Sequence, residues 1–431
     1  MATVIPRSDH PISRSQLPEH ALKVLYRLKK AGYASYFVGG GVRDLLLGLE
    51  PKDFDVATDA RPEEVKRLFR NSRLIGRRFR LAHIRFGREI VEVATFRGGG
   101  DSNDKAGQQL LDESGKILRD NLYGSLEEDA FRRDFTVNAL YYNIADFSVV
   151  DYVGGLADIK VGKIRAIGDP ATRYREDPVR MLRALRFAVK LGFRIDADTA
   201  APMAELASLL EDIPAARLYE EVQKMFLAGK AVQTFEMLRH YDLFRYLFPL
   251  TDSALTRQQD DFPLTFLARA LQDTDTRIAQ EQSVTPAFLY AALLWEPVRQ
   301  RMESLEAGGV SSFEALHRAV DEVSGAQQQH ASIPRRFGVT VREIFHLQLR
   351  LANNRGKRAL RALAHPRFRA AYDFLVLRAK AGEADQALAD WWTQVQEENA
   401  PQQRAMIEGG SASRKRPRRR RPRRSKVNGN D

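Results

Sequence analysis

The segment around residues 36–58 constrains the fold of this chain more than any other. A run of strand-forming residues, Tyr36-Phe37-Val38, leads directly into Gly39-Gly40-Gly41, and a short apolar helical segment follows over Val42–Leu47. Asp53-Phe54-Asp55 then opens a second predicted strand, Phe54–Thr58. A strand, a glycine turn, a helix and another strand within so few residues predict a helix packed against a sheet.

Further elements extend this α/β unit. An amphipathic helix is predicted over Ala21–Ala31, and Pro62 opens another over Glu63–Phe69. Strands are predicted over Ala82–Phe86 and Ile90–Phe96. The glycine-rich polar segment Gly98–Gly115 predicts a loop.

From Leu126 to about Val395 the periodicity is mostly helical, and after Ala400 the composition turns to Pro, Gly, Ser and Arg. We therefore expect an α+β fold, with a small mixed-sheet head followed by an all-helical neck, body and leg and a disordered basic tail. The expected divisions are an N-terminal extension (1–20), a head (21–150), a neck (151–215), a body (216–400) and a tail (401–431).

The two aspartates suggest a metal site. Side chains alternate faces along a strand, so Asp53 and Asp55 are expected on one side, where Mg²⁺ would relieve their repulsion. Glu92 lies in an otherwise apolar strand, where an unpaired charge is costly. If the two strands are neighbours, Glu92 would be the third acid of a two-metal site. The alternative is that Asp53 caps the strand entry and pairs with Lys52 or Arg43.

The glycine turn suggests phosphate binding. Glycines let the backbone approach a phosphate, helix N-terminal amides bind anions, and Arg43 adds a forked donor. The segment is neither a P-loop, since no Gly-Lys-Ser/Thr follows, nor a dinucleotide fingerprint, since Asp44 replaces the third glycine. An ordinary tight turn is the alternative.

Two later segments combine arginines with acids. Asp177 before Pro178 suits a helix N-cap, and Arg180, Arg183 and Arg186 then share one helix face. The opposite face is apolar and contains Met181, Leu182, Leu185 and Val189. The alternative is a solvated arginine face.

The second segment is Arg132-Arg133-Asp134, where Asp134 and Asn138 are expected on one helix face. The alternative is an Arg133–Asp134 ion pair.

The basic residues are concentrated near the C-terminus. The segment 414–426 provides ten of the charges behind the formal net charge of +12, so the remainder carries +2. Such a block attracts polyanions, which favours RNA contact through Arg418, Arg419 and Arg420. A second stretch without acids, residues 350–369, includes Arg355, Lys357 and Arg358. A solubilising tail and a solvated helix pair are the alternatives.

Composition excludes several classes. The chain has no cysteine, which removes disulfides, thiolate zinc sites and a cysteine nucleophile and fits a cytoplasmic protein. No apolar run approaches the ~20 residues of a membrane span, and residues 1–19 lack the apolar core of a signal peptide.

Four motifs in order resemble one family, the class II nucleotidyltransferases, which comprise the bacterial poly(A) polymerases and the tRNA CCA-adding enzymes. They are the glycine turn with Arg43-Asp44, the Asp53-Phe54-Asp55 motif, the segment 132–138 and the segment 175–183. The resemblance covers residues 36–190. It implies metal ligation by Asp53 and Asp55, with Asp134 or Glu92 as a further catalytic acid. It also implies nucleotide contacts from Gly39, Gly40, Arg43, Arg133, Asp177, Arg180 and Arg183.

Three features favour the poly(A) polymerase branch: the segment 74–84, the arginine-rich tail and the N-terminal Ile12-Ser13-Arg14. The expected reaction is template-independent adenylyl transfer from ATP to RNA 3′ ends. CCA addition and a non-catalytic RNA-binding role are the alternatives. No histidine is followed by Asp, which excludes an appended metal phosphohydrolase domain. His83 is interpreted as a packed strand residue. Proteins of RNA decay or RNA chaperones are expected partners, and their identity stays open.

Overall fold

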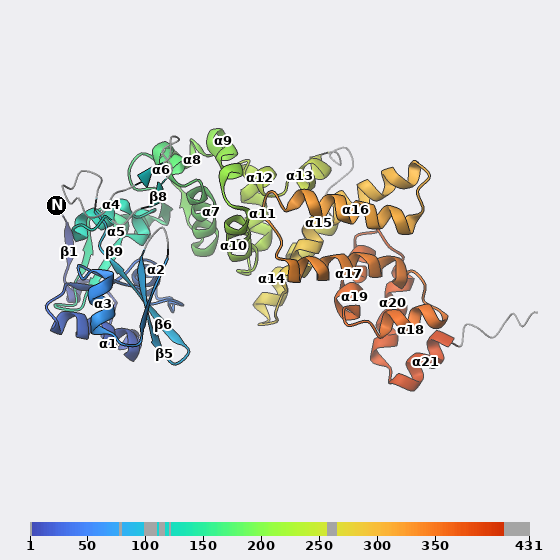
Figure 1. Ribbon diagram of the computed structural model, residues 1–431, viewed down its shortest axis with the longest axis horizontal. Coiled ribbons are helices and arrows are strands. Elements are labelled where there is room, and N and C mark those ends of the chain that lie inside the picture. Colours follow the sequence, from blue (N-terminus) through green and yellow to red (C-terminus); the bar gives the residue numbers. More distant parts are fainter. Residues whose placement is uncertain are drawn as a thin grey trace, which may run out of the picture. The chain divides into compact units, whose positions relative to one another are not determined.

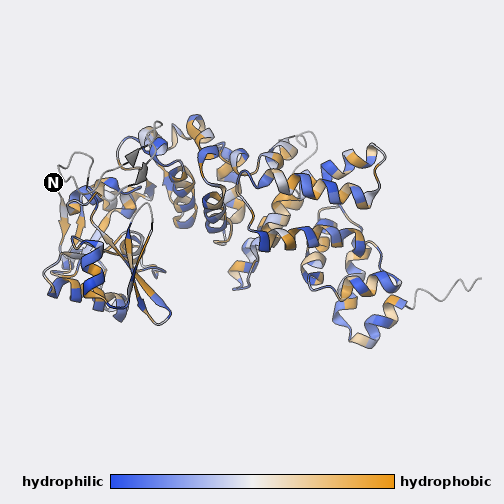
Figure 2. Cartoon of the chain, in the orientation of Figure 1, coloured by the Kyte–Doolittle hydropathy of each residue, from blue (hydrophilic) through white to orange (hydrophobic). Residues whose placement is uncertain are grey.

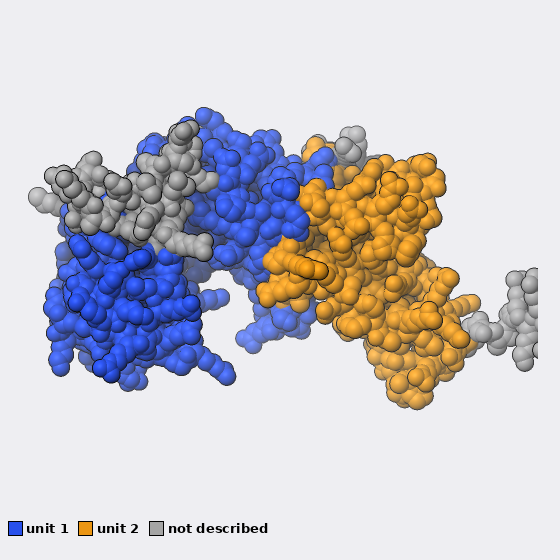
Figure 3. Space-filling model, viewed as in Figure 1, with its two compact units in different colours: residues 1–253, 274–283, 327–332 blue, residues 254–273, 284–326, 333–431 orange. Residues whose placement is uncertain are grey.

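The computed structural model describes residues 2–76, 80–98, 110–111, 117–119, 122–256 and 265–408. They form two compact units (Figure 3). Unit 1 comprises the described residues within 1–253, 274–283 and 327–332, and unit 2 comprises those within 254–273, 284–326 and 333–431. The head and the whole of the neck segment lie in unit 1.

An eight-stranded mixed sheet forms the head (Figure 1). Its spatial order is β1, β10, β9, β2, β3, β6, β5 and β4. The pairing of β3 with β6 is parallel and the other pairings are antiparallel. The strands are β1 (Thr3–Ile5), β2 (Ser35–Val38), β3 (Val56–Thr58), β4 (Ser72–Ile75), β5 (Leu81–Phe86), β6 (Glu89–Thr95), β9 (Leu140–Asn143) and β10 (Val149–Asp151).

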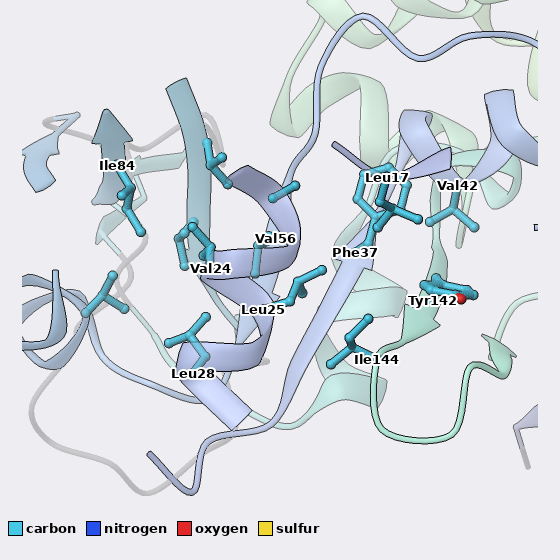
Figure 4. Packing of buried hydrophobic residues seen from close by; sticks show 14 of the residues in the cluster. Leu17, Val24, Leu25, Leu28, Phe37, Val42, Val56, Ile84, Tyr142 and Ile144 are labelled. Atoms are coloured by element: carbon cyan, nitrogen blue, oxygen red, sulfur yellow. The ribbon is translucent and has the colours of Figure 1, made fainter. Parts of the chain in front are cut away.

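Helix α1 (Glu19–Lys30) covers one face of this sheet and supplies much of its core (Figure 4). Val24, Leu25 and Leu28 recur at helical spacing, are fully buried, and belong to one cluster with Phe37 and Val56 of the adjacent strands. The periodicity that predicted this helix is therefore the pattern of its buried face.

The remaining chain is mainly helical, and its helices carry hydrophobic and hydrophilic residues on different faces (Figure 2). None of the helices in the described ranges is long and apolar enough to cross a membrane. After α1, in chain order, come α2 (Gly40–Leu46), α3 (Pro62–Leu68), α4 (Leu126–Arg132), α5 (Gly155–Val161), α6 (Pro170–Glu176), α7 (Val179–Leu191), α8 (Ala197–Ala200), α9 (Met203–Leu206), α10 (Ala215–Phe226), α11 (Ala231–His240), α12 (Phe244–Leu247) and α13 (Pro249–Thr256). They are followed by α14 (Thr265–Ala279), α15 (Pro286–Ala307), α16 (Ser312–Gln327), α17 (Arg335–Leu351), α18 (Gly356–Leu363), α19 (Phe368–Lys380), α20 (Gln386–Glu397) and α21 (Ala400–Glu408).

The predicted α+β class, with a mixed-sheet head and a helical remainder, is confirmed. The prediction of helix from Leu126 onward is wrong over β9 and β10. In the head sheet, β9 lies between β10 and β2, and β10 lies between β1 and β9. Residues 140–142 of β9 are all buried, and so is all of β10. A short strand buried on both faces lacks the alternation that distinguishes a strand from a helix. Strands β1 and β4 were not predicted.

Three predicted features fall wholly or partly outside the described residues. Of the expected loop 98–115, the structure describes Gly98 and the two-residue strand β7 (Leu110–Leu111), which pairs with β8 (Ile117–Arg119). Residues 77–79 of the segment 74–84 are not described. The basic block with Arg418, Arg419 and Arg420 is not described either.

Candidate active site

Asp53 and Asp55 immediately precede β3, and Glu92 lies on the neighbouring strand β6. Strand β3 starts at Val56, so the predicted strand start at Phe54 is two residues too early and both aspartates precede the strand. The ladder to β6 begins at the pair Val56–Val93, and the Asp55 carbonyl accepts a hydrogen bond from the Val38 N–H at the strand entry. This register places Asp55 beside Glu92, as expected for neighbouring strands.

The environment of Asp55 is strongly negative. Loss of hydration raises the pKa of Asp55 from 3.8 to about 6, the charges of Glu92 and Asp53 act in the same direction, and Arg133 opposes them. The carboxylates of Asp53 and Asp55 are exposed, and neither carboxylate forms a hydrogen bond or ion pair within the part of the chain that the structure describes. The alternative pairing of Asp53 with Arg43 is wrong, since Arg43 has other partners.

Glu92 has a single cross-strand partner in the described residues. His83 on β5 lies opposite Glu92 on β6, and its Nε2 lies 3.1 Å from Glu92 Oε2. The His83 side chain is 24% exposed and that of Glu92 is 40% exposed. His83 therefore packs on the strand, as the sequence indicated, and also fixes the orientation of the acid beside Asp55.

The geometry of the turn between β2 and α2 requires glycine. Gly39 has φ +73°, which L-residues with a side chain rarely adopt. A Cβ on Gly41 would lie 2.2 Å from the ring of Phe37. The Gly39 N–H donates to the Leu140 carbonyl, so the turn is bound to β9. It brings the first amides of α2 next to Arg133, whose Nη1 would lie 3.1 Å from a Cβ on Gly39.

Arg43 is held inside the head and is only 2% exposed. Its guanidinium donates to Asp44 Oδ1 at 2.6 and 2.8 Å and to Asn138 Oδ1 at 2.5 Å. Lys190 of α7 contacts the other oxygen of Asp44 at 3.1 Å. Arg43 therefore connects the glycine turn to the neck, and a phosphate reaching it would meet a guanidinium of fixed orientation.

The alternative of an ion pair between Arg133 and Asp134 is wrong. Arg133 donates to Asp129 Oδ2 and to the hydroxyl of Tyr141. Arg183 of α7 binds Asp134, with its Nη2 2.5 Å from Oδ2. The two neighbours in sequence therefore pair in different directions.

Asp134 is fully satisfied by its surroundings. Burial opposes its ionisation, but Arg183, the Asn138 amide and the Phe135 N–H together lower the pKa of Asp134 to about 2. The expected shared helix face with Asn138 is wrong, because α4 ends at Arg132 and Asn138 lies in a separate 3-10 turn, Thr136–Asn138. Their side chains nevertheless meet, at 3.2 Å.

The three arginines of α7 are each paired with an acid. Arg180 contacts Glu176, Arg183 contacts Asp134, and Arg186 contacts Glu221. Met181, Leu182, Leu185 and Val189 are buried on the other side of the helix, as predicted. A freely solvated arginine face is therefore wrong, because specific acids orient all three guanidinium groups.

Asp177 does not cap α7. Pro178 occupies the N-cap position, and the two oxygens of Asp177 accept hydrogen bonds from Arg217 Nη1 and Nη2 at 2.8 and 2.7 Å. Proline already fixes the first turn, so the carboxylate is available for a distant partner. Arg217 lies on α10 and was not predicted. Arg217 belongs to none of the sequence motifs and lies 40 residues from the acid that it binds, so nothing in the sequence singled it out.

Arg173 is a second residue that sequence reasoning missed. Its Nη2 donates to the carbonyls of Arg132 and Arg133 at 2.7 Å, and its own carbonyl accepts from Arg180. Through Arg173, the neck helices α6 and α7 are hydrogen-bonded to the segment that bears Asp134. Backbone carbonyls are present in every residue, so the sequence does not show that Arg173 binds those of Arg132 and Arg133.

Arg355, Lys357 and Arg358 lie at the start of α18 in unit 2 and are exposed. None of them has an acidic partner in the described part of the chain. They are therefore available to a polyanion, and their contact with RNA remains a prediction.

The acids fit a hard divalent cation. Asp53 and Asp55 present exposed carboxylates that have no ion-pair partner among the described residues, and loss of hydration together with the charges of Glu92 and Asp53 raises the pKa of Asp55, a penalty on its ionised form that a bound cation would relieve. The described residues contain no ready-made group of three or more metal-ligating side chains. A metal here would therefore take further oxygen ligands from substrate phosphates and water, as Mg²⁺ commonly does.

A sheet-borne acid group beside a glycine turn, with oriented arginines behind it, defines a nucleotidyltransferase head. The fold agrees. A solved CCA-adding enzyme of Bacillus stearothermophilus in complex with CTP is 25% identical and has a TM-score of 0.57, over 87% of this chain and 82% of that one. The CCA-adding enzyme of Leuconostoc mesenteroides is 39% identical over 54% of this chain and 56% of its own length.

Longer similarities identify the branch. Family profiles described as "Poly A polymerase head domain", "Probable RNA and SrmB- binding site of polymerase A" and "Polymerase A arginine-rich C-terminus" match residues 35–165, 192–255 and 308–426. Poly(A) polymerase I of Salmonella typhi is 50% identical over 98% of this chain and 93% of its own length. The chain belongs to the bacterial poly(A) polymerase family, and it is a nucleotidyltransferase.

Proposed function

We propose that this protein adds AMP from ATP to the 3′-hydroxyl of RNA without a template and releases pyrophosphate. The observation that carries the proposal is the exposed, unpaired Asp53 and Asp55 beside the glycine turn. Similarity to a poly(A) polymerase over 98% of the chain supports adenylate as the transferred group.

Asp53 and Asp55 would hold two Mg²⁺ ions together with the triphosphate. When bound, the metal lowers the pKa of the attacking hydroxyl and stabilises charge on the leaving group. The attacking 3′ oxygen forms a bond to the α-phosphorus, the bond from that phosphorus to the bridging oxygen breaks, and pyrophosphate leaves with that oxygen. The hydroxyl proton passes to solvent.

Glu92 is the better candidate for the third catalytic acid. It lies in register beside Asp55, and its charge contributes to the raised pKa of Asp55. Asp134 instead has its oxygens engaged by Arg183, Asn138 and the Phe135 N–H. We therefore assign Asp134 to orienting Arg183 rather than to metal binding.

The nucleotide would lie between the turn and α7. The backbone at Gly39 and Gly40 would approach the triphosphate, with Arg43, Arg133 and Arg183 as oriented cations. Asp177 and Arg180 would present hydrogen-bonding groups to the edge of the base. The two hydrogen bonds from Arg217 hold the Asp177 carboxylate in one orientation. This supports selection of the nucleotide base by the protein itself, because a carboxylate of fixed orientation can accept hydrogen bonds from only some base edges.

The test is adenylate transfer to an unstructured oligoadenylate by Asp53→Ala and Asp55→Ala variants. We expect both to lose tailing while the circular dichroism spectrum stays native. Glu89→Gln, at an exposed acid on β6, is the matched control and should tail normally. Tailing by either aspartate variant would contradict the assignment.

CCA addition is the second candidate, since CCA-adding enzymes match half of this chain or more. The same protein should be offered the oligoadenylate and, separately, a tRNA lacking its 3′ end, each with ATP and CTP. Long adenylate tails on the oligomer support the first function. CTP-dependent addition of only three nucleotides to the tRNA would overturn it, and binding of RNA without transfer to either would indicate a non-catalytic role.

A further inference from the structure

Unit 2 carries an exposed aromatic stack between α16 and α17. The ring of His317 lies 3.8 Å from that of His346, at an interplanar angle of 33°, and 4.5 Å from that of Phe313. Phe313 is 62% exposed, an unusual state for a large apolar side chain that could gain roughly 1.5–3 kcal/mol by burial. The three rings, tilted by 56° between Phe313 and His317 and by 33° between His317 and His346, thus form a continuous aromatic ladder whose outermost ring, Phe313, is exposed.

The inner ring of this stack is uncharged at neutral pH. Burial and the neighbouring His317 lower the pKa of His346 to about 4, and Arg350 and Arg342 act in the same direction against Asp321. Its Nε2 is buried and has no hydrogen-bond partner. The inner ring of the ladder, His346, is therefore a neutral aromatic ring.

Cations border the ladder. Arg350, in the last turn of α17, is exposed and close enough to act on His346. The next helix, α18, packs against α17 and carries Lys357, Arg358 and Arg361, with Arg355 at its N-cap. These five side chains are exposed, and no acid pairs with any of them in the described residues. By contrast, Arg342 is neutralised by Asp321 at 3.2 Å.

We propose that Phe313, His317 and His346 form a base-stacking platform for a single RNA strand whose phosphates follow Arg350 and the cations of α18. Neutral aromatic faces beside unpaired cations are the combination that binds single strands without sequence preference. A protein partner would explain the exposed ring but not five unpaired cations beside it. The inference rests on the proposed function for its choice of RNA.

The test is equilibrium binding of the full-length protein to a labelled oligoadenylate of about 20 nucleotides, long enough for such a site. An abasic oligomer of the same length is the second probe. The variants are Phe313→Leu, which keeps an exposed apolar side chain but loses the ring, and Phe313→Tyr, which keeps the ring. No ATP is needed, so failure of catalysis and failure of this proposal are separable.

We expect Phe313→Leu to weaken oligoadenylate binding about fivefold or more, the low end of base–aromatic stacking. Phe313→Tyr should stay within about twofold of the parent, and neither variant should change binding of the abasic oligomer. Arg350→Gln should lower the slope of log affinity against log salt by about 0.7, the value for one phosphate on a single strand, whereas Phe313→Leu should leave the slope unchanged.

Two results would overturn the platform. One is oligoadenylate affinity within about twofold of the parent in Phe313→Leu, which would leave the exposed ring to a protein contact. The other is an equal loss of affinity for the oligoadenylate and the abasic oligomer, which would mean that the ring supports the local fold. Circular dichroism of both variants, with Phe313→Tyr as the rescue, detects the second case directly.

Discussion

Neutralising Asp55 should remove activity and at the same time stabilise the metal-free head. The pKa of Asp55 is raised from 3.8 to about 6 in the folded protein. A group whose pKa is raised on folding favours the fold when protonated, and that contribution is lost as pH rises through the folded value. At pH 8 without metal, Asp55 is therefore a destabilising charge that Asp55→Asn removes.

The shift sets the size of the effect. At about 1.4 kcal/mol per pKa unit, a rise from 3.8 to about 6 corresponds to roughly 3 kcal/mol at most. Asp55 is exposed, so solvent screens the repulsion, and we expect about 1 kcal/mol. The gain should fall by roughly half between pH 8 and pH 4, because the carboxylate then becomes protonated in the folded as well as in the unfolded chain.

The assay must report on the head itself. All three tryptophans, Trp295, Trp391 and Trp392, lie in unit 2, so their fluorescence does not follow the head. Hydrogen exchange of peptides that contain β3 and β6 does so, and about 1 kcal/mol should slow their exchange roughly fivefold in EDTA at pH 8. Glu89→Gln on β6 is the matched control and should leave the rate unchanged.

Unchanged or faster exchange in Asp55→Asn at pH 8 would refute the reasoning. It would mean that the ionised Asp55 carboxylate already has a stabilising protein partner in the metal-free fold. Asp55 would then be a structural residue at the strand entry rather than a metal ligand. A gain equal at pH 4 and pH 8 would also contradict it, since the effect would not depend on ionisation.

Three further outcomes follow from the site. Asp134→Asn should destabilise unit 1 by about 3 kcal/mol or more in chemical denaturation, since it leaves the Arg183 guanidinium without its buried partner; a loss below about 1 kcal/mol would contradict the pairing. Gly41→Ala should abolish tailing and lower the melting temperature, because its Cβ would overlap the adjacent phenyl ring; normal activity would show that the turn can relax. Arg217→Gln should reduce the ratio of kcat/KM for ATP over CTP by about tenfold, because Asp177 loses its two fixed bonds; an unchanged ratio would remove Arg217 from specificity.

The sequence located the acids and the turn because their constraints are local. Gly39 has a backbone conformation that selects glycine, and Asp53 and Asp55 immediately precede β3, so each feature is confined to a few neighbouring residues. The strand β9 escaped because burial on both faces removes alternation. Strand β9 anchors the glycine turn, because the Gly39 N–H donates to the Leu140 carbonyl, and this contact between distant residues has no local sequence pattern.

The partners of the arginines could not be predicted, for a physical reason. Spacing along a helix shows which arginines share a face, but an ion pair depends on which acid the tertiary fold brings within about 4 Å. The adjacent Arg133 and Asp134 seemed natural partners, yet they bind Asp129 and Arg183. Adjacent residues diverge because the chain leaves α4 at this point and their side chains face different elements.

These pairings give the site an uneven charge balance. In the described residues, the guanidinium groups of Arg43, Arg133 and Arg183 each have an acidic partner, whereas Asp53 and Asp55 have no cationic one. The unmet charge of the substrate-free site is therefore negative, although several arginines surround it. Asp53 and Asp55 would repel free ATP, and the nearby arginines are already paired with acids. A metal–nucleotide complex would instead bring the cation that the two aspartates lack. The paired acids also hold each guanidinium in place before substrate arrives, which lowers the ordering cost of binding. The same network that neutralises the arginines thus prepares the site for the metal complex of the nucleotide rather than for the nucleotide alone.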